Sequence, residues 1–65
     1  MGAKVREYKL GDLVENISYI RKPRLKGIII KCLGFDKELD DFIYKIYCYN
    51  TGKLEFWAHH GIKKI

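Results

Sequence analysis

Residues 42–57 read Phe42-Ile43-Tyr44-Lys45-Ile46-Tyr47-Cys48-Tyr49-Asn50-Thr51-Gly52-Lys53-Leu54-Glu55-Phe56-Trp57, and they carry the clearest structural pattern of the chain. Most of its first eight residues are aromatic or β-branched, and such side chains favour a pleated, half-buried strand. The segment 50–53 contains residues that tolerate positive φ angles, so it predicts a tight turn. We therefore expect a β-hairpin here that forms the centre of the core.

The apolar segments on either side of this hairpin also predict short strands. We expect strands at 13–20, 28–33 and 62–65, a basic loop at 21–27, a polar connection at 34–41 and one 3₁₀ turn at 58–61. No segment has the pattern of an amphipathic helix. Five short strands indicate an all-β fold, a small barrel or sandwich without a substantial α-helix. Its expected core includes Val14, Ile29, Ile46, Phe56 and Ile62.

A chain of 65 residues makes one domain. A domain of this size buries only about 60% of its unfolded surface and rarely walls a deep pocket. No apolar run approaches the roughly 20 residues that cross a bilayer, and residues 1–4 lack the apolar stretch of a signal peptide. We expect an intracellular protein, with residues 1–8 as an N-terminal arm or opening strand and residues 9–65 as the domain.

The order of the landmarks along the chain resembles that of the SH3-like barrel. These landmarks are Gly11-Asp12-Leu13-Val14, Gly27-Ile28-Ile29-Ile30, Tyr44-Lys45-Ile46-Tyr47, Trp57 and Ile62-Lys63-Lys64-Ile65. They look like those of short barrel proteins encoded by tailed bacteriophages. The resemblance implies a five-stranded antiparallel SH3-like barrel over residues 9–65 and a viral origin, in the host cytoplasm or in the virion. Its motifs mark a fold and carry no chemistry of their own.

The net charge of +5 is unevenly distributed. Residues 1–31 carry eight positive and three negative side chains, whereas residues 32–65 carry five of each. The excess is concentrated in one loop by Arg21, Lys22, Arg24 and Lys26, while the segment 36–41 is acidic through Asp36, Glu38, Asp40 and Asp41. The basic loop alone would suit phosphate groups, and both loops together would suit a complementary protein surface. A solvated surface that keeps a small protein soluble is the third interpretation.

Alternation along the hairpin predicts a second candidate surface. If Tyr44, Ile46 and Cys48 point inward, then Ile43, Lys45, Tyr47 and Tyr49 point outward, joined by Trp57 if Leu54 and Phe56 face the core. Outward Tyr and Trp rings can stack bases or anchor a protein partner. Alternatively, several of these rings only cover a small core.

The residue types that usually carry catalysis or bind metals are sparse and poorly arranged. Cys32 and Cys48 fit no zinc pattern and indicate small buried thiols in preference to a cross-strand disulfide. His59 and His60 point to opposite sides of an extended chain and cannot chelate one metal, so we expect one to pack and the other to be solvated. Asp40-Asp41 lie in a turn, where carboxylates more often cap backbone amides than act as acid or base. With no phosphate loop, activated nucleophile or convergent carboxylate pair, we predict a non-enzyme without catalytic residues, metal or cofactor.

Two function classes remain. The first is a binding module in protein–protein contact, a small structural or accessory component of a bacteriophage particle, whose partner is another protein or further copies of the chain. The alternative is a basic nucleic-acid-binding barrel that uses the loop 21–26. We expect neither a membrane nor a small-molecule substrate as partner. The predicted partner-binding residues are Arg21, Lys22, Arg24, Lys26, Lys45, Tyr47, Tyr49 and Trp57.

Overall fold

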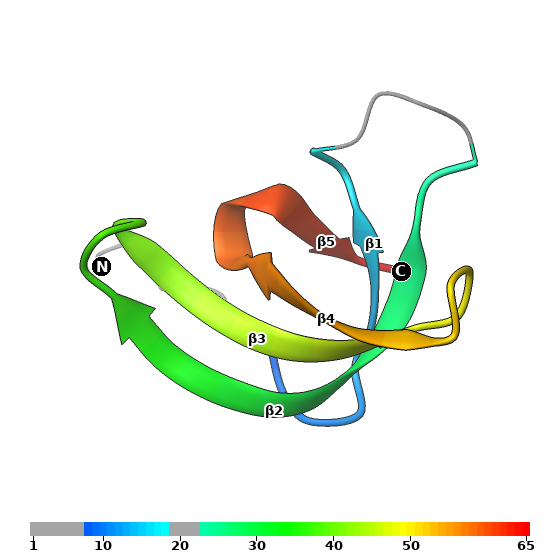
Figure 1. Ribbon diagram of the computed structural model, residues 1–65, viewed down its shortest axis with the longest axis horizontal. Coiled ribbons are helices and arrows are strands. Elements are labelled where there is room, and N and C mark those ends of the chain that lie inside the picture. Colours follow the sequence, from blue (N-terminus) through cyan, green and yellow to red (C-terminus); the bar gives the residue numbers. More distant parts are fainter. Residues whose placement is uncertain (1–7, 19–22) are drawn as a thin grey trace, which may run out of the picture.

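The computed structural model describes residues 8–18 and 23–65, which form five β-strands. The strands are β1 (Leu13–Asn16), β2 (Lys26–Asp36), β3 (Asp41–Cys48), β4 (Lys53–Ala58) and β5 (Ile62–Lys64), with the 3₁₀ turn η1 (His59–Gly61) before β5. They make one antiparallel sheet in the order β4-β3-β2-β1-β5 (Figure 1). The predictions of five antiparallel strands and of one 3₁₀ turn are confirmed. No helix within the described ranges is long and apolar enough to cross a membrane.

The predicted hairpin is present as β3 and β4. Its turn occupies residues 49–52, one residue earlier than predicted, and Gly52 has a φ of 69°. The Gly52 N–H donates to the carbonyl of Cys48 at 2.8 Å, which closes the turn. This register sets Cys48 opposite Lys53 and Tyr47 opposite Leu54.

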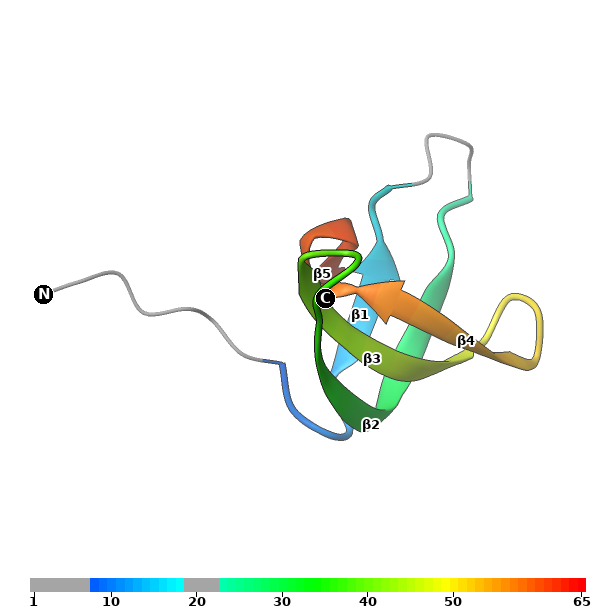
Figure 2. The same cartoon turned by 60° about the vertical axis from the view of Figure 1, so that its left-hand side comes forward.

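β2 is longer than predicted and bends strongly. Its last residues were expected in the connection 34–41, but Gly34 and Phe35 pair with Ile43 and Phe42 of β3. The register shifts twice, between Ile29 and Lys31 and again between Cys32 and Gly34. Such bulges increase the bend and twist of a strand, so β2 curves beneath β3 and lets one sheet wrap around its core (Figure 2).

Side chains from all five strands meet in one core. The buried members are Val14, Ile29, Tyr44, Ile46, Cys48, Trp57 and Ile62, and Tyr8 and Leu25 pack against them. The predictions for Val14, Ile29, Ile46 and Ile62 are confirmed. The prediction for Phe56 is wrong, because Phe56 is 63% exposed and its neighbour Trp57 points into the core instead.

The backbones of β2 and β3 approach closely at Gly27. A Cβ atom there would lie 2.5 Å from Ile46 Cγ2 and closer still to the carbonyl oxygen of Tyr47. A residue with no side chain is therefore required beside Ile46, and this close approach lets Ile46 be fully buried.

β1 ends earlier than the predicted strand 13–20. The Oδ1 atom of Asn16 accepts a hydrogen bond from the Ser18 N–H at 3.0 Å. A side chain that bonds to the local backbone offers an alternative to the strand ladder, so the chain turns away after Asn16. Residues 19–20 lie outside the described part of the chain.

The two cysteines have different environments. Cys48 is buried as predicted, but Cys32 is exposed, because it lies on the part of β2 that extends beyond its pairing with β1. Cys32 is opposite Tyr44, whereas Cys48 is opposite Gly27, four positions further along β3. At about 3.3 Å per residue this separation exceeds what a disulfide can bridge, and both thiols are free.

Candidate interaction surface

The side of the sheet that faces away from the core, here called the outer face, carries an apolar row across four strands. Leu13 is opposite Ile28, Ile28 is opposite Tyr47, and Tyr47 is opposite Leu54. Residues directly opposite each other share one face of a sheet. Tyr47 is 38% and Leu54 52% exposed. Contiguous apolar surface of this kind marks interaction sites on soluble proteins.

A pair of lysines lies beside this apolar row. Lys31 is opposite Lys45, and Lys45 is opposite Phe56 on β4. Neither lysine forms an ion pair with any residue of 8–18 or 23–65. Like charges that face each other across two strands destabilise a sheet. The pair therefore concentrates positive charge on the outer face.

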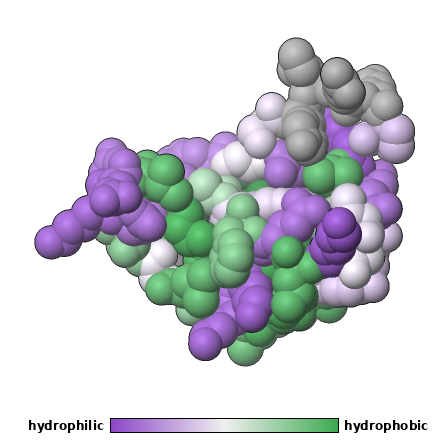
Figure 3. Space-filling view, in the orientation of Figure 1, coloured by the Kyte–Doolittle hydropathy of each residue, from purple (hydrophilic) through white to green (hydrophobic). Residues whose placement is uncertain are grey.

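An apolar hollow of about 370 Å³ opens on the outer face next to these lysines. Its apolar walls are Leu33, Leu39, Ile43 and Phe56, and Gly34, Phe35 and Asp36 complete the lining. The ring of Phe35 contacts that of Phe42, its partner on β3, on the other side of the sheet. The walls come from β2, β3, β4 and the turn between β2 and β3. In the space-filling view, apolar residues spread over the middle of the molecule and hydrophilic residues project at the end where this turn lies (Figure 3).

The turn at 37–40 presents an exposed leucine between two exposed acids. Asp36 Oδ1 accepts hydrogen bonds from the N–H groups of Glu38 at 2.8 Å and Leu39 at 3.1 Å, which fixes the shape of the turn. Glu38 and Asp40 flank Leu39, and all three side chains are exposed. Asp41, predicted to belong to this acidic surface, is buried instead. The acidic surface is thus the segment 36–40, with Lys37 as its one positive charge.

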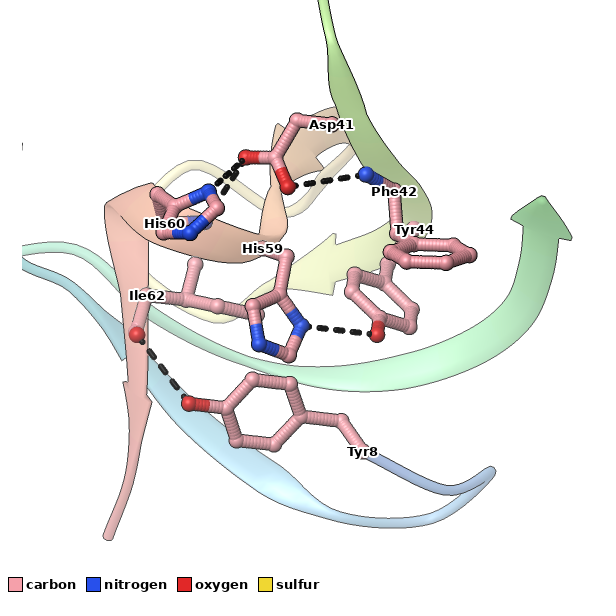
Figure 4. A network of polar contacts seen from close by, with 7 residues as sticks. All are labelled: Tyr8, Asp41, Phe42, Tyr44, His59, His60 and Ile62. Carbon is pink, nitrogen blue, oxygen red and sulfur yellow. Dashed lines mark hydrogen bonds and ion pairs between the residues drawn. The ribbon is translucent and has the colours of Figure 1, made fainter. Parts of the chain in front are cut away.

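Asp41 holds η1 against the start of β3 (Figure 4). Its Oδ2 accepts the His60 N–H at 2.8 Å and lies 2.9 Å from His60 Nδ1, while its Oδ1 accepts the Phe42 N–H at 2.8 Å. Burial raises the pKa of Asp41, but these hydrogen bonds and the charge of His60 outweigh it and lower the pKa from the ordinary value of 3.8. The prediction that carboxylates here cap backbone amides is confirmed for Asp41.

The two histidines differ as predicted, one packed and one solvated. His59 Nδ1 lies 3.1 Å from the Tyr44 hydroxyl, and its ring lies 4.9 Å from the ring of Tyr8. The His60 side chain is 83% exposed. Tyr8, at the end of the predicted arm, donates a hydrogen bond to the carbonyl of Ile62 at 3.2 Å. Within the described ranges, no group of three or more His, Cys, Asp or Glu side chains is arranged to hold a metal ion.

The basic loop meets the outward tyrosines at its last cation, Lys26, which lies beside Tyr49. Arg24 and Lys26 line a hollow of about 400 Å³ together with Glu15 and Pro23. The Tyr49 N–H donates to the carbonyl of Lys26 at 2.8 Å, and the rings of Tyr47 and Tyr49 are 5.7 Å apart. The fold thus brings the basic loop and the outward tyrosines together, although the two groups are far apart along the chain. Arg21 and Lys22 lie outside the described residues.

The predicted outward residues of β3 are confirmed, and the prediction for β4 is wrong. Tyr47 and Tyr49 are exposed and Lys45 faces outward, but Trp57 is only 5% exposed and cannot offer its ring to a partner. The sequence contained the missing signal. A turn of even length places Leu54 and Phe56 on the same side as Tyr47 and Tyr49, so Trp57 must face the core. Leu54 and Phe56 are the surface residues that sequence reasoning missed.

Comparison with known proteins supplies no family for this chain. The function must therefore be inferred from the outer face, from the basic residues Arg24 and Lys26 and from the acidic segment 36–40. No protein-family model, no curated protein and no solved structure matches the chain.

Proposed function

We propose that the chain is a non-enzymatic binding module with an SH3-like barrel fold that acts in protein–protein contact, as a small structural or accessory component of a bacteriophage particle. The barrel is supported by the strongly bent β2, by one core shared among five strands, and by a one-turn link before a short last strand. The bacteriophage origin is supported by the sequence resemblance over residues 9–65.

The observation that carries the contact function is the apolar row Leu13, Ile28, Tyr47 and Leu54, whose members are exposed except for the half-buried Ile28. Exposed ion pairs contribute only about 0–1 kcal/mol each, so charges orient a contact without supplying most of its affinity. Tyrosine is enriched among the few residues that dominate the energetics of interfaces, and burial of other exposed apolar side chains adds to them. The affinity therefore comes from Tyr47, Leu54 and Phe56. The basic residues Arg24 and Lys26 and the acidic segment 36–40 set the orientation of the contact.

The small size of the chain favours attachment through several contacts at once. The accessible surface is 5045 Å² in all, so one standard interface of roughly 800 Å² per partner would take a large share of it. Linked weak contacts can together exceed the affinity of any one of them. A position among repeated neighbours in a particle provides such contacts.

The test is incorporation of the chain into the particle or complex purified from its native source. Quantitative mass spectrometry should find the chain at a fixed stoichiometry, and Leu54→Lys should remove it from the particle. Leu10→Lys is the matched control, because Leu10 is also highly exposed but lies in the turn before β1. Recovery of the wild-type chain only as a free protein would reject the structural role.

A second candidate function is nucleic-acid binding, favoured by the position of Lys26 beside Tyr49, whose ring contacts that of Tyr47. Tyrosine rings stack bases without strong sequence preference, and the cations neutralise phosphates. Affinity for labelled oligonucleotides should then fall with salt, with a log–log slope of about −0.9 per phosphate neutralised on duplex DNA. Replacing Arg21, Lys22, Arg24 and Lys26 by alanine should weaken binding to all sequences alike. No binding to DNA or RNA at low salt would reject this function.

A further inference from the structure

We propose that the outer face beside the β2–β3 turn binds a second copy of this chain in a two-fold symmetric dimer. The proposal rests on the contact function above and names the partner. Its surface consists of the acidic turn (Glu38 and Asp40), the apolar hollow (Leu33, Leu39, Ile43 and Phe56) and the lysine pair (Lys31 and Lys45).

The three parts of this surface follow one another along β3. The turn ends at Asp40, Ile43 lies in the wall of the hollow, and Lys45 belongs to the lysine pair. A strand rises about 3.3 Å per residue, so the acidic turn and the lysine pair are roughly 17 Å apart with the hollow between them. The surface is therefore negative at one end, apolar in the middle and positive at the other end.

A two-fold axis through the hollow makes such a surface complementary to itself. Two copies that face each other with opposite strand directions place the acidic turn of each copy over the lysine pair of the other. The two hollows then meet, and the exposed Phe56 and Leu39 of each copy are covered. An interface of this type repeats each contact twice, as in most symmetric dimers.

The dimer supplies counter-charges to two lysines that have none among residues 8–18 and 23–65. Lys31 and Lys45 face each other without an ion pair to any described residue, and the two acids of the turn would supply the missing counter-charges. A nucleic acid would also meet the lysines, but Glu38 and Asp40 at the rim of the same hollow would repel its phosphates. Charge complementarity therefore favours a second copy over a nucleic acid at this position.

The test is the oligomeric state in solution, measured by sedimentation velocity over a range of protein and salt concentrations. The wild-type chain should dimerise, and the dimer should weaken as salt rises. Variant A, Lys31→Glu with Lys45→Glu, should raise the dimer Kd at least about tenfold. Variant B, Glu38→Lys with Asp40→Asn, should do the same, and asparagine suits residue 40 because Asp40 has a φ of 55°.

Mixing the two variants tests directly whether the acidic turn of one copy contacts the lysine pair of the other. In an equimolar mixture of A and B, both charge contacts of the proposed dimer are attractive, so a heterodimer should form at concentrations where each variant alone dimerises only weakly. The matched control is Lys53→Glu with Lys63→Glu, which makes the same change in net charge away from the hollow and should leave the dimer unchanged. Phe56→Ser should weaken the dimer about tenfold or more while leaving Trp57 fluorescence unchanged.

A wild-type chain that stays monomeric at every concentration, or a dimer that is insensitive to variant A and to Phe56→Ser, would overturn the proposal. Failure to rescue dimerisation by mixing A with B would overturn the charge pairing and with it the two-fold arrangement. Incorporation into a particle by a monomeric wild-type chain would leave the contact function intact and assign the outer face to a different protein. Oligonucleotide binding that variant A abolishes, without self-association, would assign the lysine pair to nucleic acid.

Discussion

Trp57 and Phe56 are neighbours on β4 with opposite environments, and this difference can be measured. Trp57→Ala should lower the free energy of unfolding by about 3–5 kcal/mol, because it empties part of the core. Phe56→Ala should change it by no more than about 0.5 kcal/mol, because that ring is largely in water. Urea denaturation followed by far-UV circular dichroism measures both values. A larger loss for Phe56→Ala than for Trp57→Ala would contradict the orientation of β4.

At the scale of elements, Asp41 fastens η1 to β3, and this link should be sensitive to acid. The pKa of Asp41 is lower in the folded chain than its ordinary value of 3.8, so the carboxylate stabilises the fold above that value. The stabilisation is lost as the pH falls through the folded pKa. Asp41→Asn should cost about 1–3 kcal/mol at neutral pH and should make the loss of stability below pH 4 shallower. Thermal unfolding between pH 2 and pH 7 provides the measurement.

Asp40→Asn is the control for this prediction. Asp40 is exposed, and asparagine tolerates its φ of 55° as well as aspartate does. At protein concentrations below the dimer Kd, its stability profile should therefore follow that of the wild-type chain. Equal effects of the two substitutions would show that general charge repulsion, and not the Asp41 link, sets the acid sensitivity.

For the whole molecule, one core shared by five strands predicts a single cooperative unfolding transition. Small single domains usually unfold in this way, with a total stability of about 3–10 kcal/mol at this length. Trp57 is the only tryptophan and lies in that core, so its fluorescence and the far-UV circular dichroism should change together in denaturant. Ile46→Ala should shift both transitions equally by about 2–5 kcal/mol, a large part of the total. Two separate transitions would contradict a single core.

Local residue preferences determined much of the fold. The aromatic and β-branched run at 42–49, the turn residues after it and the short apolar segments were enough to predict the hairpin, the five strands and the 3₁₀ turn. Alternation also placed Tyr44, Ile46 and Cys48 inside and Lys45, Tyr47 and Tyr49 outside, so part of the candidate surface was predictable. These features depend on neighbours along the chain, which a sequence contains directly.

Pairing between distant segments decided the rest. The bulges near Ile30 and Leu33 depend on the pairing of β2 with β3. The same pairing continues to Asp36, so β2 runs into the segment that was predicted as a connection. The burial of Asp41 depends on the backbone of His60, nineteen positions away along the chain. The apolar hollow joins β2, β3, β4 and a turn, so no single stretch of sequence contains it. Residue types along the chain are enough to show which segments become strands. Which side chains those strands bring together follows from the register, and the register is set by contacts across the sheet.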